Sequence, residues 1–310
     1  MPCTQLLLVG AGLALLFGGG ETLVRGAVAL AARLGLPPAL IGLTVVGFGT
    51  SMPELVVSLD AALGGTNDIA VGNVLGSNIA NILLILGLSA LVWPIATAGL
   101  SLRRDLMAML GATLVLIPLF LLGSVGRIAG AALVAGLAVY LWSAFRDPSQ
   151  GDGGDAGTDA AARTPFLHAL GFVAAGLLAL VFGARFLVDG AVTIARDLGV
   201  SEAFIGLTIV AVGTSLPELA TSVVAALRRQ SGIAVGNVVG SNIFNVLGIL
   251  GLTATLSPLV LSPRFLIIDL PVVIAASLAL IVLLRQPRIG RLVGAALLAA
   301  YAGYVVFGLG

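Results

Sequence analysis

The chain has 310 residues, of which 59% are hydrophobic and 9% are charged, and its mean hydropathy is +1.17. Soluble domains carry charge on about a quarter of their residues, so this composition excludes an ordinary soluble domain. The net charge of +1 argues against a nucleic-acid partner. One Cys and one His leave no thiolate or imidazole cluster for a metal ion. The composition therefore predicts a polytopic membrane protein.

Ten apolar runs follow one another along the chain. A helix needs about 20 apolar residues to cross a bilayer, and continuous runs of this kind are typical of such helices. We therefore expect an all-α fold with ten transmembrane helices, which makes the lipid bilayer a partner of the chain. The runs lie near residues 4–20, 38–63, 69–93, 105–122, 127–145, 166–184, 203–227, 233–256, 266–284 and 290–308.

Arginine placement predicts how the chain is oriented, because cytoplasmic loops carry an excess of basic residues. If the N-terminus is outside, the inside loops hold eleven arginines and the outside loops hold four. Arg25 and Arg33 are among the eleven, because we expect both in the inside loop between the first two apolar runs. This distribution favours both termini outside. The Gly- and Asp-rich segment 146–165 is then a flexible cytoplasmic linker.

The main feature of the sequence is an internal repeat with a constant offset of 164 residues. Residues 41–88 and 205–252 share 31 identities in 48 positions without a gap. The two halves, residues 1–145 and 166–310, each hold five apolar runs, and an odd number inserts the second half the other way up. Inverted repeats with interrupted helices are typical of secondary transporters, whose substrate site lies near the bilayer midplane. We therefore expect two inverted five-helix repeats with broken helices at the centre.

One repeated motif places a glutamate inside an apolar run of each half. It reads Gly-Thr-Ser-Met-Pro-Glu at 49–54 and Gly-Thr-Ser-Leu-Pro-Glu at 213–218. A charge at the bilayer centre costs about 2.5–3.5 kcal/mol, so these glutamates indicate function, with a protonated or packing-paired side chain as the alternative. The proline before each glutamate lacks an N–H and frees a carbonyl four residues back. The motif therefore predicts a broken helix whose oxygens can bind a cation.

A second repeated motif adds hydroxyls and amides, at 76–81 and 240–245. Residues three or four apart share a helix face, so these groups can converge with the glutamates. A set of hard oxygens suits Ca²⁺ or Na⁺ rather than zinc or copper. The GxxxG pairs at 72–76 and 236–240 are interpreted as packing sites that bring the second broken helix of each half against the first. The candidate side-chain ligands are Glu54, Glu218, Thr50, Ser51, Thr214, Ser215, Ser77, Ser241, Asn81 and Asn245.

The two motif pairs resemble the alpha repeats of the sodium/calcium exchanger family, within the cation/calcium antiporters, and they are most similar to its short microbial members. The resemblance implies exchange of Na⁺ for Ca²⁺ by alternating access, with both ions as substrates and no cofactor. It implies that Glu54 and Glu218 are the central ligands and that the carbonyls of Gly47 and Ala211 help flanking sodium sites. In the family, the first and sixth helices slide across the core, here the runs near 4–20 and 166–184. We expect a prokaryotic inner-membrane protein.

The chain departs from part of the family at one position. Some members, including the potassium-dependent branch, carry Asp at the position of Asn245, whereas this chain has Asn at both 81 and 245. We interpret the Asn pair as evidence against potassium co-transport. The resemblance implies electrogenic exchange, typically of three Na⁺ for one Ca²⁺. Ca²⁺ would neutralise the two formal negative charges of the site, and three Na⁺ would leave an excess of one positive charge.

Two other transport functions could use Glu54 and Glu218. An H⁺/Ca²⁺ antiporter would use the same glutamates, and a passive channel could use them as a selectivity ring. We do not expect an enzyme, because the chain has no Lys, no His-metal cluster and no His near a nucleophile. The sequence leaves the oligomeric state open, with a monomer as one option.

Overall fold

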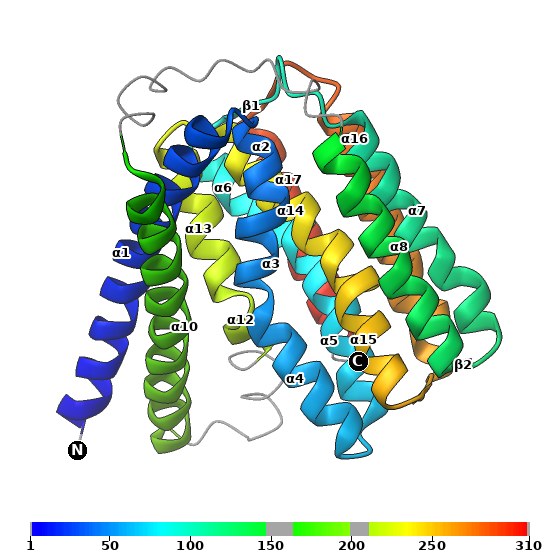
Figure 1. The fold of residues 1–310 in the computed structure, drawn as a ribbon. Helices are drawn as coiled ribbons and strands as arrows, with labels where there is room; N and C mark the ends of the chain where they lie inside the picture. Colours follow the sequence, from blue (N-terminus) through cyan, green and yellow to red (C-terminus); the bar gives the residue numbers. More distant parts are fainter. Residues whose placement is uncertain (1, 147–163, 199–210, 309–310) are drawn as a thin grey trace.

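The structure is a computed structural model, and it describes residues 2–146, 164–198 and 211–308 of the chain (Figure 1). Residues 147–163 of the predicted linker and residues 203–210 of the predicted run at 203–227 fall outside these residues. The described part consists of helices, connecting turns and two short strand pairs. The helical prediction is therefore confirmed, and the strand pairs are an addition to it.

Both halves contain helices that are interrupted by short π-helical segments, denoted η. The first half contains α1 (Pro2–Leu34), α2 (Pro38–Ile41), η1 (Gly42–Val46), α3 (Gly47–Thr50), α4 (Met52–Leu63), α5 (Asn67–Ala80), η2 (Asn81–Ile85), α6 (Leu86–Val92), α7 (Arg103–Leu121) and α8 (Arg127–Arg146). The second contains α10 (Phe166–Asp197), α12 (Ala211–Thr214), α13 (Leu216–Leu227), α14 (Ser231–Ile243), η5 (Phe244–Leu250), α15 (Gly251–Leu256), η6 (Phe265–Asp269), α16 (Leu270–Leu283) and α17 (Arg291–Gly308).

Seven of the described helical segments are long and apolar enough to cross a bilayer, and the bent pair Pro38–Thr50 and Met52–Leu63 makes an eighth. Two shorter apolar helices, Leu216–Leu227 and Arg291–Phe307, fall within the remaining predicted runs. The count of ten spans stays a prediction, because neither short helix reaches spanning length within the described residues.

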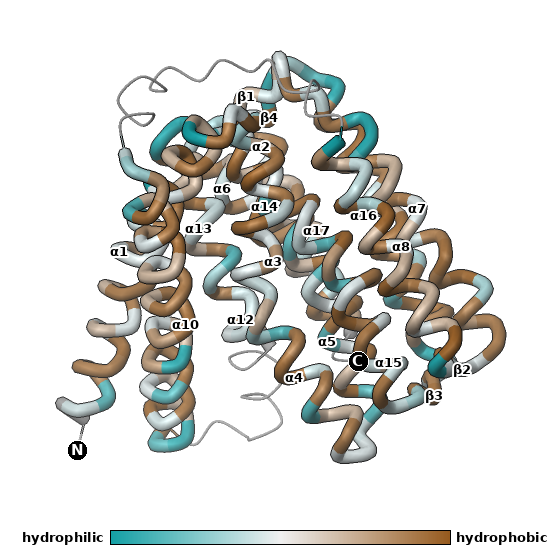
Figure 2. Tube along the Cα trace, in the orientation of Figure 1, coloured by the Kyte–Doolittle hydropathy of each residue, from teal (hydrophilic) through white to brown (hydrophobic). Residues whose placement is uncertain are grey.

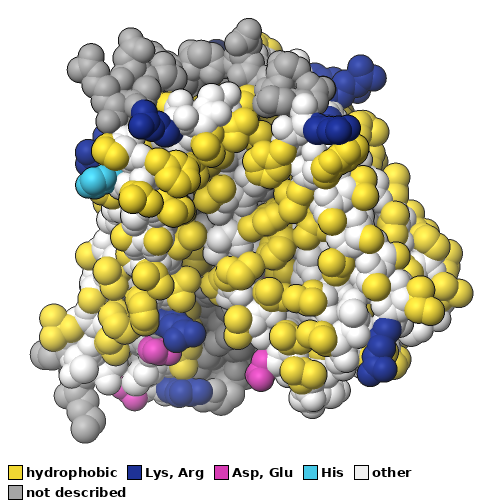
Figure 3. Space-filling view, in the orientation of Figure 1, with side chains coloured by type: hydrophobic (Ala, Val, Ile, Leu, Met, Phe, Trp, Pro, Cys, Tyr) yellow, Lys and Arg dark blue, Asp and Glu magenta, His cyan; other side chains and the backbone are white. Residues whose placement is uncertain are grey.

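The surface of the bundle is apolar between two charged ends. Hydrophobic side chains cover the middle of the face shown in Figure 3, and arginines lie toward its upper and lower edges. The hydropathy along the chain follows the same pattern, with hydrophobic helices and hydrophilic turns (Figure 2). Ile128 and Leu292 are each 88% exposed. Exposed apolar surface on this scale is stable in lipid and unfavourable in water.

The helices α1 and α10 are longer than the runs 4–20 and 166–184 that predict them. They contain 33 and 32 residues, which at 1.5 Å per residue is about 50 Å, well beyond a hydrocarbon core of about 30 Å. Arg25 and Arg33 were expected in a loop, and this expectation is wrong, because both lie inside α1. Arg25 stacks on the Phe172 ring of α10, 4.9 Å from its centroid. Charged residues such as Arg25 interrupt the apolar pattern of the sequence, but the helix continues through them to Leu34.

Two short strand pairs join the halves of this helical fold. β1 (Ile95–Ala96) pairs with β4 (Arg288–Ile289), and β2 (Ser124–Val125) pairs with β3 (Leu259–Val260), both antiparallel. The offset of 164 residues converts β1 into β3 and β2 into β4. Strands of two residues leave no periodic pattern, so the sequence does not signal them.

A seam of glycines brings α1 and α10 into backbone contact. A Cβ atom added at Gly176 would lie 2.6 Å from the backbone nitrogen of Leu23, and one added at Gly26 would lie 2.7 Å from that of Val173. Small residues allow two membrane helices to approach this closely. The seam repeats with a spacing of seven residues and the offset of 164, at Gly12, Gly19 and Gly26 on α1 and at Gly176, Gly183 and Gly190 on α10.

The buried side chains form two separate clusters. One lies along α1 and α10 where they face α2 and α13, and it includes Leu23, Leu180 and Val224. The larger one surrounds α5 and α14 and includes Ile79, Ile243 and Leu116. The pair α1 and α10 lies side by side at one edge of the bundle (Figure 1), and its buried cluster is shared with α2, η1, α13 and α14.

The glycines of the GxxxG pair at 236–240 do not make the predicted contact between two helices of the same half. A Cβ atom at Gly236 would lie 2.5 Å from the carbonyl oxygen of Ala39, and one at Gly240 would clash with the carbonyl of Leu43. Both partners belong to α2 and η1 of the first half. These glycines therefore bring the two halves together, which a motif found within one half could not reveal.

The glycine seam predicts opposite effects for two substitutions in α10. Gly176→Ala should lower the free energy of unfolding by about 1–3 kcal/mol, because its methyl group meets backbone that cannot move aside. Gly171 has open space around its Cβ position, so Gly171→Ala should leave stability unchanged or raise it slightly. Thermal unfolding in detergent measures both, and equal effects would contradict the packing described here.

Candidate cation-binding site

The first helix break lies at Ser51, between α3 and α4. Ser51 leaves the helical conformation with φ −83° and ψ 8°, and the helices on either side are bent by 43°. Pro53 lies in the first turn of α4, where a missing N–H costs no hydrogen bond. Glu54 lies in the same turn, where the helix dipole favours a negative charge.

The second half repeats this break at Ser215, between α12 and α13. Ser215 has φ −90° and ψ 8°, and its N–H donates to the carbonyl of Val212 at 3.1 Å. Pro217 and Glu218 occupy the first turn of α13. The predicted interruption of the helix is confirmed in both halves, at the serine two residues before each proline.

The two halves exchange hydrogen bonds at these breaks. Ser51 Oγ donates to Glu218 Oε1 at 2.8 Å, and Ser215 Oγ donates to Glu54 Oε1 at 3.0 Å. Each glutamate is only 1% exposed. The sequence grouped Ser51 with Glu54 on one helix face, but the hydrogen bonds cross between the halves. One carboxylate therefore cannot shift without disturbing the other half.

Two asparagines donate hydrogen bonds to the backbone carbonyls of the glutamates, and the sequence analysis did not identify them. The Asn73 amide donates to the carbonyl of Glu54 at 3.1 Å and to Ser58 Oγ at 2.9 Å. The second half repeats the two contacts at 3.2 and 2.9 Å, from Asn237 to Glu218 and Ser222. Both asparagines occur in the repeated sequence Ala-Val-Gly-Asn. Repetition of a polar residue inside an apolar run was the signal that could have identified them.

The remaining hydroxyls lie close to the same centre. Thr50 Oγ1 contacts the carbonyl of Val46 at 3.0 Å and the side-chain oxygen of Asn237 at 3.1 Å. Ser241 Oγ donates to the carbonyl of Gly47 at 3.2 Å. The structure thus brings Thr50, Ser241 and the Gly47 carbonyl together.

The other predicted positions are placed as follows. Ser77 is buried in α5 and Thr214 is half-buried at the end of α12. Ala211 begins α12 at the edge of the described residues, and its side chain lies outside them.

An amide network joins the halves beside the glutamates. Asn245 Nδ2 donates to Asn78 Oδ1 at 3.0 Å, and Asn81 Nδ2 contacts Asn242 Oδ1 at 3.5 Å. Asn81 begins η2 and Asn245 lies in η5. π-Helical turns of this kind occur frequently at functional sites. Sequence reasoning included Asn81 and Asn245 but missed both their partners and the π-helical backbone.

Four oxygens at the centre accept no hydrogen bond from the described residues, although all four are buried. They are Glu54 Oε2, Glu218 Oε2, Asn81 Oδ1 and Asn245 Oδ1. A buried acceptor without a donor costs about 1–3 kcal/mol, and more if it is charged. A bound cation removes this cost for every oxygen that it contacts. Two carboxylates and two amides are hard oxygen ligands, which fits Ca²⁺ or Na⁺.

Apolar helices around a buried centre of carboxylate, hydroxyl and amide oxygens define an integral membrane protein that handles cations. The sequence profile of the family described as "Sodium/calcium exchanger protein" matches the chain twice, over residues 4–146 and 168–310. The chain therefore belongs to the sodium/calcium exchanger family, whose members are membrane antiporters.

Relatives along the whole length agree with this assignment. The chain is 40% identical to the putative antiporter CaxA of Alkalimonas amylolytica, covering 94% of this chain and 95% of CaxA. It is 32% identical to the sodium/calcium exchanger MaX1 of Methanosarcina acetivorans, with 99% of each chain covered. Among solved structures, the exchanger NCX_Mj superimposes with a TM-score of 0.85 at 31% identity, with 99% of each chain covered.

The site predicts a large stability loss on removal of one missed asparagine. Asn237→Ala deletes two donated hydrogen bonds and leaves buried acceptors unpaired, so we expect a loss of about 2–4 kcal/mol. Asn67→Ala, at the half-buried start of α5, should change stability by less than about 0.5 kcal/mol. Thermal unfolding compares the two variants, and equal stabilities would show that the amide does not hold Glu218 in place.

Proposed function

We propose that the protein is a secondary active antiporter that exchanges Na⁺ for Ca²⁺ by alternating access. The observation that carries this proposal is the crossed pair of serine–glutamate hydrogen bonds, which leaves one oxygen of each carboxylate buried and unpaired. Ca²⁺ takes six to eight oxygens. The two carboxylates, the amides and the neighbouring hydroxyls supply a set of that size from both halves.

The proposed sites for the two ions overlap. Glu54 and Glu218 are the central ligands for either ion, and the carbonyls of Gly47 and Ala211 contribute to flanking sodium sites. Binding of Ca²⁺ then excludes Na⁺ from the same carboxylates, which is the competition that an exchanger requires. The further ligands are drawn from Thr50, Ser51, Ser77, Asn81, Thr214, Ser215, Ser241 and Asn245. Solved structures of NCX_Mj are described as soaked with Na⁺ together with Ca²⁺ or Sr²⁺, which agrees with this ligand chemistry.

We further propose ten spans in two inverted repeats, residues 1–145 and 166–310. The strand pairs support this arrangement, because the offset of 164 converts one pair into the other. The segment 146–165 is a cytoplasmic linker and both termini lie outside. A relative in Escherichia coli, 39% identical over 98% of this chain, is named inner membrane protein YrbG, and we propose the same membrane here.

The moving element of the proposed cycle is the pair α1 and α10. The glycine seam holds the two helices together, so the pair can move as one body. The buried cluster between this pair and the helices that it faces is separate from the larger cluster around α5 and α14. Leu177 of α10 touches the Cβ position of Gly49, and Val188 touches that of Gly213. Both glycines belong to the repeated motifs, so a shift of the pair alters access to the glutamates.

H⁺/Ca²⁺ exchange through the same glutamates is the alternative. The specific observation in its favour is that no basic side chain pairs with either carboxylate among the described residues. A buried carboxyl group without a cation takes up a proton more readily than an exposed one. Proteoliposomes loaded with Na⁺ and diluted into Ca²⁺ buffer separate the two, because Na⁺ exchange survives a collapsed pH gradient and H⁺ exchange does not.

Neutralising either central glutamate should abolish exchange. Glu54→Gln and Glu218→Gln each remove a charge from a buried site, so we expect Ca²⁺ uptake to fall at least about 100-fold. Asp60→Asn is the matched control, because Asp60 lies exposed on the same helix as Glu54. Uptake at the wild-type rate in both glutamine variants would exclude the proposed site.

We propose electrogenic exchange, on the ratio of three Na⁺ to one Ca²⁺ that the resemblance to the sodium/calcium exchangers implies. Three Na⁺ leaving for one Ca²⁺ entering moves one positive charge outward. In Na⁺-loaded proteoliposomes containing valinomycin, uptake should therefore be faster when the interior is made positive than when it is made negative. The same rate at both potentials would indicate electroneutral exchange.

A further inference from the structure

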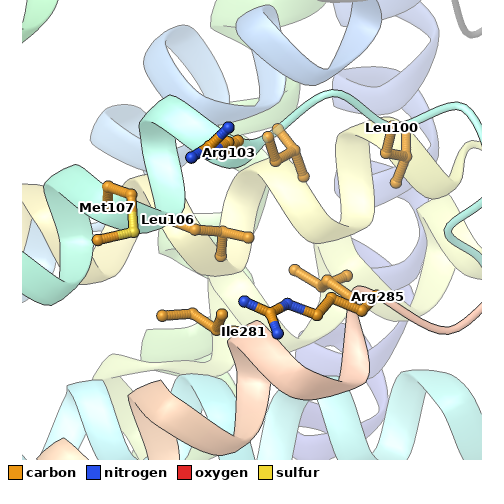
Figure 4. A pocket seen from close by; sticks show the side chains of 8 residues that line it. Leu100, Arg103, Leu106, Met107, Ile281 and Arg285 are labelled. Carbon is orange, nitrogen blue, oxygen red and sulfur yellow. The ribbon is translucent and has the colours of Figure 1, made fainter.

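A cavity of about 390 Å³ lies between α7 and α16, and neither of the central glutamates lines it. Arg103 contributes to it from α7 and Arg285 from the turn after α16, and Leu106 and Ile281 line the same cavity (Figure 4). Met107 lines it as well and is 53% exposed. The cavity therefore combines two cationic side chains with an apolar wall at the surface of the bundle.

The charges of these two arginines are not neutralised within the described part of the chain. Among the described residues, no hydrogen bond or ion pair joins the side chain of Arg103 or Arg285 to another residue, and no acidic residue lines the cavity. The neighbouring carboxylate, Asp105, is engaged by Arg104 at 3.0 Å and by the Tyr140 hydroxyl at 3.0 Å. The cavity thus presents two positive charges that are available to a ligand.

The internal repeat shows that packing of these helices does not require the arginines. At the positions 164 residues away, Arg103 is replaced by Ile267 and Arg285 by Leu121, which are 70% and 68% exposed. Leu106 corresponds to Leu270 and Ile281 to Ile117, so these two positions are apolar in both halves. The same helix contact therefore forms with or without the charges, and the arginine pair is specific to one end of the bundle.

We propose that this cavity binds one anionic phospholipid from the surrounding bilayer. Its phosphate lies between the two guanidinium groups, which form charge-assisted hydrogen bonds with phosphate oxygens. Its acyl chains follow the apolar wall of Leu106, Met107 and Ile281. Basic pockets between membrane helices are a recognised site for acidic lipid headgroups. The cavity volume suits a small headgroup, and the apolar wall beside the arginines selects a lipid over a free anion.

The test measures lipid binding by the intact protein in detergent, and it does not depend on which ions are exchanged. Native mass spectrometry counts bound lipid, and thermal unfolding reports its effect on stability. Phosphatidylglycerol is titrated against phosphatidylcholine with the same acyl chains. We expect the wild type to bind one phosphatidylglycerol at least about tenfold more tightly than the double variant Arg103→Gln/Arg285→Gln. Phosphatidylcholine should show no such difference.

Two controls keep the result specific. Arg127→Gln/Arg291→Gln removes two exposed arginines at the starts of α8 and α17, and it should bind phosphatidylglycerol like the wild type. Inorganic phosphate should not raise the unfolding temperature, because it lacks acyl chains. Equal phosphatidylglycerol affinity in the wild type and the cavity variant would overturn the proposal. Stabilisation of the wild type by phosphate alone would replace the lipid with a free anion and overturn it too.

Discussion

The structure depends on two carboxylates that are buried in the centre of a membrane protein and that have no basic partner among the described residues. Glu54 and Glu218 are each held by a serine of the opposite half, and each keeps one oxygen unpaired. An isolated charge in a low-dielectric interior is costly unless it is paired. The partner that we propose for both carboxylates is a cation, and the folded chain supplies the oxygens that would bind it.

The rest of the fold fixes the positions of these two carboxylates. Helix breaks place each glutamate in the first turn of a half-helix, where the dipole favours its charge. Glycines in α14 let it touch the first half, so the centre is assembled from backbone contact between the halves. In contrast, α1 and α10 contact each other more closely than they contact the core, through the glycine seam. A rigid core and a separate helix pair are the two bodies that alternating access needs.

The repeat allowed much of this to be predicted, because a polar residue that recurs inside two apolar runs has few structural explanations. It identified Glu54, Glu218 and the neighbouring serines, and the prolines predicted the helix breaks. It could not show that Ser51 serves the glutamate of the other half, because a pattern along one chain does not encode contacts across 167 residues. Asn73 and Asn237 carried the same repeat signal as the glutamates, but the sequence analysis assigned them no role. The π-helical turns and the two-residue strands are set by tertiary contacts, and no local preference marks them.

The central claim is that one divalent ion binds between the two halves and contacts both glutamates. A crystal structure of the Ca²⁺-soaked protein, recorded at a long wavelength for anomalous scattering, tests this claim most directly. The account predicts one strong peak within about 2.3–2.6 Å of oxygens from both Glu54 and Glu218. A peak that contacts only one of the two glutamates, or one that lies away from the helix breaks, would contradict it.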